Sequence, residues 1–205
     1  IATEYFAHGN LKDRLTTALT INESVCYFSQ IANALRALHA AGIFHRDLKP
    51  ANVMRRADDS LVLIDFGLAR RAESSTIVTL AGEVRGSPYY MSPEQAEGKS
   101  LDERSDLYSL GVMFFEMLAG SKPYNGQNVH QILQSHIRGG IPRLPQHAAR
   151  FQNVIDRLMA KSAVDRYATA TAALLAVEAA QCARAIITSL APASSQIHAA
   201  SGADC

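Results

Sequence analysis

Hydrophobic residues recur with a helical period over most of the chain, and the pattern is clearest between residues 23 and 41. Apolar residues three or four positions apart fall on one face of an α-helix. In this segment they are Val25, Phe28, Ile31, Leu35 and Leu38. Thr20 and Glu23 have the spacing of a capping box, and Gly42 is placed to end the helix. The sequence therefore predicts a helix over 23–41 with both ends specified.

The same period predicts further helices over 11–19, 104–119, 127–138, 148–160 and 169–187. Two short apolar runs, 53–54 and 61–64, lie on either side of residues 57–60, whose composition is typical of a turn. These runs predict one small β-hairpin in an otherwise helical chain.

Three segments lack a clear period. Residues 1–10 are typical of a strand end and a connector, and residues 188–205 of a flexible tail rich in Ala and Ser. Residues 65–94 have almost no periodic pattern, and a segment of this length is more often functional than accidental. The pattern predicts an α+β protein, mostly α, with one domain over 1–187.

The composition limits the classes of partner and of metal or disulfide site that are expected. The 205 residues are 48% hydrophobic and 19% charged, as in an ordinary globular protein, and the net charge is +1. That balance gives no reason to expect nucleic acid as a partner. The cysteines Cys26, Cys182 and Cys205 form no CxxC pair, which favours reduced thiols over a disulfide framework or a zinc site.

The sequence also bears on where the protein is located. No apolar run approaches the roughly 20 residues of a membrane helix, and no signal peptide is visible, so we expect a cytoplasmic segment without membrane contact. The first residue is Ile1, not Met, so we expect a piece of a longer protein, which could itself be membrane-anchored.

The sequence HRDLKPAN at residues 45–52 brings together an acid, a cation and an amide on a loop. Asp47 can accept a proton or orient a hydroxyl, and Lys49 can neutralise a phosphate. Asn52 offers a carbonyl oxygen to a hard cation such as Mg²⁺. Phosphoryl transfer needs an oriented nucleophile, charge neutralisation and a bound metal, so the loop points to that chemistry.

Two further motifs follow in the chain. Asp65 begins the sequence DFG directly after an apolar run, where its carboxylate is a natural Mg²⁺ ligand. Glu94 ends the sequence SPE, which closes the long aperiodic segment. In this order, HRDLKPAN, DFG and SPE resemble the catalytic loop, the metal loop and the closing motif of protein kinases.

The resemblance extends from Glu4 to about Ala180, and the sequence GSPYYMSPEQA most resembles bacterial members of the family. It implies the C-terminal lobe of a protein-kinase-like fold that transfers phosphate from ATP, with Mg²⁺, to protein substrates. The sequence HRDLKP resembles serine/threonine kinases, whereas tyrosine kinases usually carry a different loop. Ser87 stands where serine/threonine kinases usually have Thr, and it keeps the hydroxyl.

The resemblance also implies roles for single residues. Asp47 is expected to be the catalytic base, and Lys49 to contact the γ-phosphate and, with Asp47, the hydroxyl of Ser87. Asn52 and Asp65 are expected to hold two Mg²⁺ ions.

Nucleotide contacts are implied as well. Glu4 to Ala7 match the hinge that binds adenine through backbone groups, Asn10 lies near the ribose position, and Met54 matches the floor under the adenine.

Other residues match structural and regulatory positions. Asp106 matches the residue that binds the backbone of the catalytic loop, and Arg166 the arginine that pairs with Glu94. Arg46 is placed to bind a phosphorylated loop, with Thr76 and Thr79 as the best candidate phosphosites.

No GxGxxG and no VAIK-like stretch precedes residue 45, so the family's N-lobe is expected to be absent from these residues, and the fragment alone to be inactive. Alternatives are a truncated or pseudokinase-like binding module, and a small-molecule kinase of related fold. His45 is expected to pack as a structural residue. Surface or cap positions are expected to explain the remaining histidines, which include His39 and His136.

Overall fold

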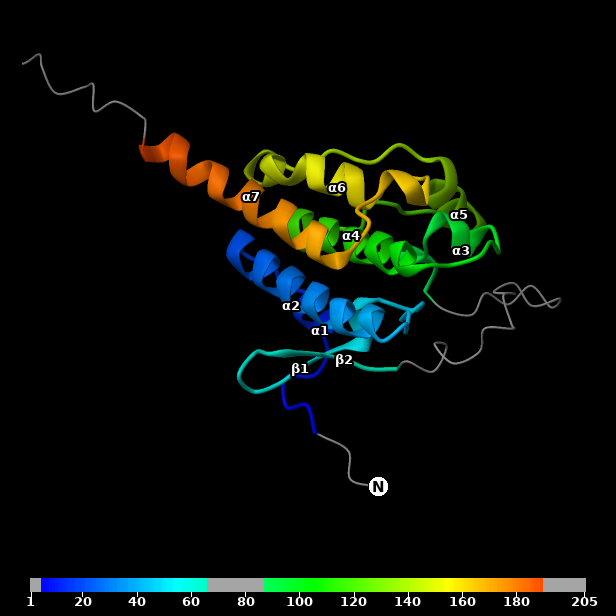
Figure 1. Cartoon of the computed structure of the whole chain (residues 1–205), viewed down its shortest axis with the longest axis horizontal. Coiled ribbons are helices and arrows are strands. Elements are labelled where there is room, and N and C mark those ends of the chain that lie inside the picture. Colours follow the sequence, from blue (N-terminus) through cyan, green and yellow to red (C-terminus); the bar gives the residue numbers. More distant parts are fainter. Residues whose placement is uncertain (1–4, 66–86, 190–205) are drawn as a thin grey trace, which may run out of the picture.

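The structure of the chain is a computed structural model, and it describes residues 5–65 and 87–189. Helices build most of the body, and one small sheet lies at its edge beside α1 and α2 (Figure 1). The helices are α1 (Leu11–Arg14), α2 (Ile21–Ala40), α3 (Pro93–Ala96), α4 (Glu103–Ala119), α5 (Val129–Arg138), α6 (Gln152–Leu158) and α7 (Ala170–Ser189). The sheet consists of β1 (Val53–Arg55) and β2 (Leu61–Leu63). The short 3-10 helices are η1 (Pro50–Asn52), η3 (Pro88–Tyr90), η4 (Gln146–Phe151) and η5 (Ala163–Asp165).

Helix α4 runs through the centre of the core, and its side chains from 105 to 118 are all buried. The ring of Phe114 lies between those of Phe28 and Phe151, with centroids 4.6 and 5.5 Å away. Gly111 lets α6 approach closely, because a Cβ at this position would lie 2.6 Å from the Cβ of Leu158. A helix buried on every side is a fixed axis to which the surrounding loops can be attached.

Helix α2 confirms the prediction made from its hydrophobic face and caps. The Thr20 hydroxyl accepts the backbone N–H of Glu23, and the Glu23 carboxylate accepts the backbone N–H of Thr20 at 2.8 Å. The helix starts at Ile21, two residues earlier than expected. Gly42 follows its end with φ 71°, a left-handed conformation that favours glycine.

The predicted β-hairpin is confirmed, and α2 holds it in place. Strands β1 and β2 pair antiparallel. The Tyr27 hydroxyl donates to Asp59 Oδ2 in the turn at 2.9 Å, and Gln30 Oε1 accepts the backbone N–H of Leu61 at 2.8 Å. The hairpin is therefore fixed relative to α2.

The helix predicted over 11–19 is wrong in its second half, because α1 ends at Arg14. The hydroxyl of Thr16 donates to the carbonyl of Asp13 at 2.8 Å, and that of Thr17 to the carbonyl of Arg14 at 3.3 Å. Such local bonds offer the backbone an alternative to the helical ladder.

Two other predictions need correction. The helix expected over 148–160 begins as the 3-10 helix η4 and becomes α-helical only at Gln152. The aperiodic segment 65–94 includes η3 and the first two residues of α3. Both elements are too short to show a period, and each has a proline in its first turn.

The remaining helices confirm the prediction within a few residues. Helices α4, α5 and α7 match the expected ranges 104–119, 127–138 and 169–187. Together with the two-stranded sheet they confirm a mostly helical chain with one small hairpin. Among residues 5–65 and 87–189, no helix is long and apolar enough to cross a membrane.

Candidate active site

Asp47, Lys49 and Asn52 lie together on the loop that leads into β1. Lys49 Nζ donates to Asp47 Oδ2 at 2.6 Å. The Asn52 amide nitrogen donates to the backbone oxygen of Asp47 at 2.9 Å and to its Oδ2 at 3.1 Å. The side chains of Asp47 and Lys49 are 19% and 20% exposed. A carboxylate and an ammonium group are thus held at the surface by a buried amide, where they can receive a proton and bind an anion.

The buried carboxylate of Asp106 holds the backbone that precedes Asp47. It accepts the backbone N–H groups of His45 at 2.9 Å and Arg46 at 2.8 Å. The backbone carbonyl of Arg46 accepts the side chain of Gln95 in α3 at 2.6 Å. Arg46 has φ 65°, a conformation that a residue with a Cβ keeps only when its surroundings impose it. Helices α3 and α4 therefore fix the direction in which the loop presents Asp47.

Two histidines support the same loop. His45 is fully buried, as expected of a packed structural residue. His39 at the end of α2 lies with Nε2 2.9 Å from Asp106 Oδ2, and its side chain is 11% exposed. His39 lies in the last turn of α2, as a cap position would require, and its partly buried ring also joins α2 to the anchor of the loop.

The end of β2 brings Asp65 beside Asn52. The backbone N–H of Ile64 donates to the backbone carbonyl of Asn52 at 3.0 Å, and Asp65 is the next residue. Asp65 is exposed and has φ 63°. The amide nitrogen of Asn52 is bound to Asp47, so its carbonyl oxygen remains for a cation. A carboxylate and an amide oxygen are donors that suit Mg²⁺.

These donors are few for a metal site built by protein alone. Among the described residues, no group of three or more His, Cys, Asp or Glu side chains could hold a metal ion. Mg²⁺ usually binds through one or two carboxylates and completes its shell with water and substrate phosphates. The residues therefore fit Mg²⁺ brought in with a nucleotide better than a resident metal.

The residues expected to contact the nucleotide are only partly described. Asn10 and Met54 face each other in an antiparallel bridge, so the connector before α1 adjoins β1. Ala7 is exposed in a turn of that connector. Glu4 lies outside the described residues.

The regulatory residues are also described in part. Ser87 precedes η3, and within the described part no hydrogen bond joins it to Asp47 or Lys49. Arg46 has a buried Nε without a hydrogen-bond partner among the described residues. Thr76 and Thr79 lie outside the described residues.

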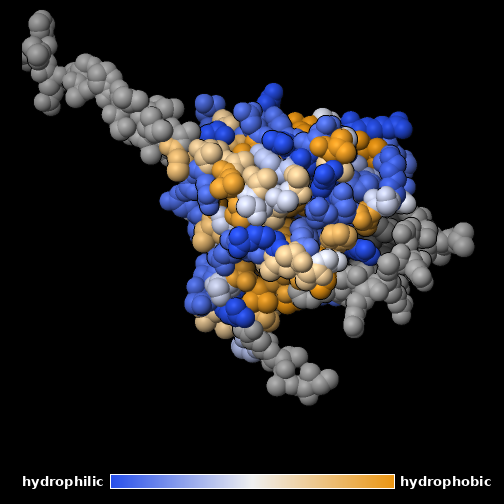
Figure 2. Space-filling view, in the orientation of Figure 1, coloured by the Kyte–Doolittle hydropathy of each residue, from blue (hydrophilic) through white to orange (hydrophobic). Residues whose placement is uncertain are grey.

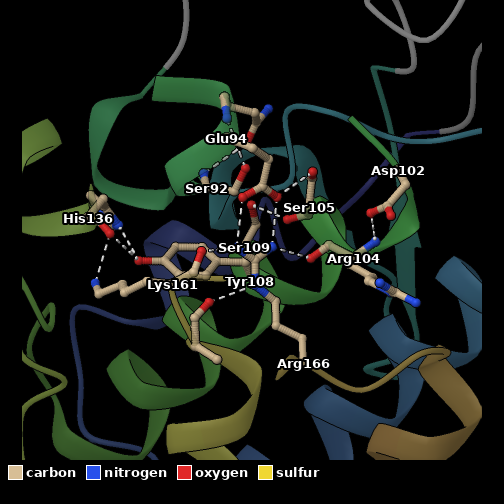
Figure 3. A network of polar contacts seen from close by, with 12 residues as sticks. Ser92, Glu94, Asp102, Arg104, Ser105, Tyr108, Ser109, His136, Lys161 and Arg166 are labelled. Carbon is tan, nitrogen blue, oxygen red and sulfur yellow. Dashed lines mark hydrogen bonds and ion pairs between the residues drawn. The ribbon is translucent and has the colours of Figure 1, made fainter. Parts of the chain in front are cut away.

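Glu94 and Arg166 form a buried pair (Figure 3). Arg166 donates to both carboxylate oxygens of Glu94 at 2.7 Å, and the hydroxyl of Ser105 donates to Glu94 Oε1 at 2.6 Å. Burial disfavours the charged carboxylate, but the hydrogen bonds and charge of Arg166 outweigh it and lower the pKa of Glu94. The pair ties α3 to the segment before α7.

A second buried group adjoins this pair, and sequence reasoning missed it. The hydroxyl oxygen of Tyr108 in α4 lies 2.9 Å from Nδ1 of His136. Lys161 Nζ donates to the backbone carbonyl of His136 at 2.8 Å (Figure 3). Burial and the charge of Lys161 lower the pKa of His136 to about 4. Burial and the charge of Arg166 lower the pKa of Lys161 to about 8.

The surface position expected for His136 is therefore wrong. A signal was available, because His136 follows the buried Ile132 by one helical turn and so lies on the same buried face of α5.

Known proteins match most of the chain. The family model described as "Protein kinase domain" matches residues 1–177. Serine/threonine-protein kinase PknB of Mycobacterium tuberculosis (strain ATCC 25618 / H37Rv) is 37% identical over 177 residues, which cover 83% of this chain and 28% of the relative.

Two relatives from Myxococcus xanthus are similar to a comparable degree. Serine/threonine-protein kinase Pkn1 is 40% identical over 164 residues, 76% of this chain and 24% of Pkn1. Serine/threonine-protein kinase pkn3 is 38% identical over 189 residues, 84% of this chain and 34% of pkn3. The chain therefore spans between 24% and 34% of the length of these three relatives.

Proposed function

This chain belongs to the protein kinase family, and from that premise we propose that it carries the catalytic loop of a serine/threonine protein kinase. Within the protein that its gene encodes, it transfers the γ-phosphoryl group of ATP to serine or threonine side chains of protein substrates. The observation that carries this proposal is the joint placement of Asp47, Lys49 and Asn52 on a loop that α4 holds through Asp106.

Asp47 acts as the catalytic base in this proposal. Its carboxylate receives the hydroxyl of the substrate and orients it toward the γ-phosphorus atom. It accepts the hydroxyl proton as the new P–O bond forms and the bond from the γ-phosphorus to the bridging oxygen breaks, so that ADP leaves. Lys49 already contacts Asp47 Oδ2, so its ammonium group can neutralise the γ-phosphate while that phosphate is transferred. Because Asp106 fixes the backbone before Asp47, the base needs little reorganisation when substrate binds.

Asn52 and Asp65 hold Mg²⁺ in this proposal. Bound Mg²⁺ neutralises charge on the phosphates of ATP. The amide nitrogen of Asn52 is bound to Asp47, which aims its carbonyl oxygen away from that carboxylate. Asp65 follows Ile64, whose backbone N–H donates to the backbone carbonyl of Asn52, and this bond supports placing the two residues at one metal site.

The connector before α1 and strand β1 form the lower side of the nucleotide site. Met54 lies under the adenine and Asn10 near the ribose, a placement supported by the bridge that joins them. Residues 4–7, from Glu4 to Ala7, supply backbone groups to the adenine edge.

The experiment for this proposal identifies the product. The protein as its gene encodes it is incubated with ATP labelled at the γ-phosphate, Mg²⁺ and a generic protein substrate, and the labelled amino acids are separated after acid hydrolysis. Label on phosphoserine or phosphothreonine supports the proposal. Label confined to phosphotyrosine, or label only in a small-molecule product, overturns it, and no label at all favours a binding module.

We also propose that residues 1–187 form the C-lobe of the kinase domain, with 188–205 as a tail. Two observations support this. The 205 residues contain no GxGxxG and no VAIK-like stretch before residue 45. Hydrophobic atoms are gathered on the surface over the hairpin (Figure 2), and Tyr5 in the adjoining connector is 87% exposed. An exposed apolar surface of this kind is a contact surface for further polypeptide.

This assignment predicts that the 205 residues alone have no measurable kinase activity, because the lid over the phosphates and its lysine are not among them. Robust transfer of labelled phosphate by the purified 205-residue polypeptide would overturn it.

Phosphorylation of the segment after Asp65 is proposed to regulate the site. The support is Arg46, whose Nε is buried without a hydrogen-bond partner among the described residues. A phosphate on Thr76 or Thr79 would give this guanidinium an anion to bind. Phosphopeptide mapping of the active protein tests the idea, and the absence of phosphate between residues 73 and 87 would sink it.

A further inference from the structure

The side chain of Gln95 in α3 binds the peptide group to which Asp47 is attached. Its Nε2 donates to the backbone carbonyl of Arg46 at 2.6 Å. That carbonyl belongs to the same planar peptide group as the N–H of Asp47. Gln95 itself is buried, with 6% of its surface exposed. A side chain from α3 therefore holds the backbone one bond away from the Cα of the proposed catalytic base.

Gln95 and Asp106 bind the backbone on opposite sides of the same strained residue. Asp106 accepts the N–H of Arg46 at 2.8 Å, and Gln95 donates to the carbonyl of Arg46. Arg46 has φ 65°, which needs support from its surroundings. Since the two peptide groups that flank a Cα define its φ and ψ, both contacts are needed to fix this conformation. Asp106 fixes the peptide group before Arg46, and Gln95 fixes the one that leads to Asp47.

The amide of Gln95 is oriented by the start of its own helix. Its Oε1 accepts the backbone N–H of Ser92 at 2.9 Å, and the Ser92 hydroxyl accepts the backbone N–H of Gln95 at 3.3 Å. A capping box takes glutamate or glutamine at this position. A carboxylate has no N–H to donate, however, so only glutamine can form the cap and also bind Arg46. The amide is therefore required by the contact with the loop and not by the cap.

Helix α3 is in turn a firm support for this amide. The preceding residue, Glu94, accepts two hydrogen bonds of 2.7 Å from the buried guanidinium of Arg166. Arg166 follows η5, far from α3 in the chain. Gln95 thus connects the backbone before Asp47 to a part of the core that Asp106 does not reach.

We propose that Gln95 is a positioning residue for phosphoryl transfer, which holds the peptide group between Arg46 and Asp47 so that the carboxylate of Asp47 faces the acceptor hydroxyl. This inference rests on the proposed function, because it treats Asp47 as the base. Without the amide, this peptide group loses its hydrogen bond to α3 and can rotate. The carboxylate is then presented less precisely, which slows a reaction that depends on alignment. Binding of ATP depends on other residues and should change little.

Two substitutions of Gln95 separate its two contacts. Gln95→Glu keeps an oxygen for the cap and loses the donor to Arg46. Gln95→Met is uncharged, loses both contacts and carries the test if the charged variant does not fold. The matched control is Gln152→Glu, the same change at a buried glutamine of α6. Within the described part of the chain, the hydrogen bonds of the Gln152 side chain go to Pro142, Leu144 and Asp156, away from the catalytic loop.

Two quantities are measured for the protein as its gene encodes it and for the three variants. The first is the steady-state kcat and the KM for ATP with a serine-containing protein substrate. The second is hydrogen–deuterium exchange, followed by mass spectrometry, in peptides that cover residues 44–52. Exchange reports opening of the loop whether or not the protein transfers phosphate.

Both Gln95 variants should lower kcat about 3- to 30-fold and leave the KM for ATP within about twofold. Exchange over residues 44–52 should become faster in both, because the bonds from Asp106 to His45 and Arg46 then hold the loop alone. Gln152→Glu also loses buried hydrogen bonds and stability, but it should change neither kcat nor the exchange of this loop.

Loop exchange that stays at the wild-type rate in the Gln95 variants overturns the inference. A kcat within about twofold of wild type, or an equal fall of kcat in Gln152→Glu, overturns it as well. A wild type that transfers no phosphate refutes the proposed function, and faster loop exchange confined to the Gln95 variants would then still support Gln95 as the anchor of the loop.

Discussion

Asp106 accepts the backbone N–H of Arg46 at 2.8 Å, although 60 residues separate them in the chain. Arg46 has φ 65°, so this bond holds a backbone conformation that a residue with a Cβ otherwise avoids. The carboxylate belongs to a helix that is buried on every side. This hydrogen bond therefore fixes the residue next to Asp47 relative to the buried core.

Substitution Asp106→Asn tests this relationship. The amide keeps the shape of the side chain but can accept through one oxygen only, so one buried N–H of the loop loses its acceptor. The unfolding free energy should fall by about 2–4 kcal/mol, and the rate of phosphoryl transfer about 10- to 100-fold. Urea denaturation and initial rates measure the two effects. Asp102→Asn is the control, because Asp102 only caps the same helix and Asn caps equally well.

Arg166→Lys should destabilise the protein although it keeps the charge. Lysine cannot make the two parallel bonds to Glu94, and a buried carboxylate is left partly unpaired. We expect a loss of about 2–4 kcal/mol in chemical denaturation. Arg14→Lys, at the partly exposed pair with Glu23, should cost less than about 1 kcal/mol. Equal losses at both positions would contradict the buried role of Arg166.

Acid should remove the stability that the Glu94–Arg166 pair contributes. The pKa of Glu94 is lowered in the folded state from its ordinary value of 4.5, so the unfolded chain binds the proton more readily. The stability that the pair contributes is present above pH 4.5 and is lost as the pH falls through the folded pKa. Stability curves of wild type and Glu94→Gln should therefore converge below pH 4.5, and parallel curves would contradict the assignment.

His136 predicts a second pH effect at higher pH. Its pKa falls from 6.5 to about 4 on folding, so the unfolded state binds more protons between these values. Stability should decrease from pH 6.5 toward pH 4, by up to about 3 kcal/mol from this group. His136→Gln should flatten the curve in that window, and the exposed His130 on the same helix gives the control His130→Gln. A slope unchanged in His136→Gln would refute this.

Mg²⁺-dependent binding of ATP tests the metal ligands. Asp65→Asn replaces a carboxylate by an amide and should weaken Mg²⁺-dependent ATP binding about 10- to 100-fold in calorimetric titrations. Asp58→Asn changes an exposed carboxylate in the turn of the same hairpin and should have no effect. If binding were equally strong with and without Mg²⁺ in both variants, Asp65 would not be a metal ligand.

The sequence predicts the elements that depend on local or periodic signals. The apolar face, capping box and glycine of α2 lie within one segment, so its range could be predicted closely. The same holds for α4, whose residues from Leu110 to Ala119 are apolar except for Glu116. The range predicted for α1 is too long, because the hydroxyls of Thr16 and Thr17 donate to backbone carbonyls. These bonds compete with helix formation, and hydrophobic spacing does not reveal them.

The candidate site likewise combines contacts that the sequence predicts and contacts that it does not. Asp47, Lys49 and Asn52 are close in sequence, so their proximity follows from one motif. The contact between Asp106 and His39 spans 67 residues, and no local signal indicates that these two side chains meet. Contacts of this kind depend on how the helices pack and cannot be predicted from spacing.

The role of Asp47 is the central claim, and one comparison of rates tests it most directly. Initial rates of phosphate transfer from labelled ATP to a serine-containing protein are measured for the protein as its gene encodes it, for Asp47→Asn and for Asp58→Asn. We expect the wild type and Asp58→Asn to transfer phosphate at similar rates, and Asp47→Asn to be slower by about 10²- to 10⁴-fold. Transfer by Asp47→Asn at the wild-type rate would contradict the account.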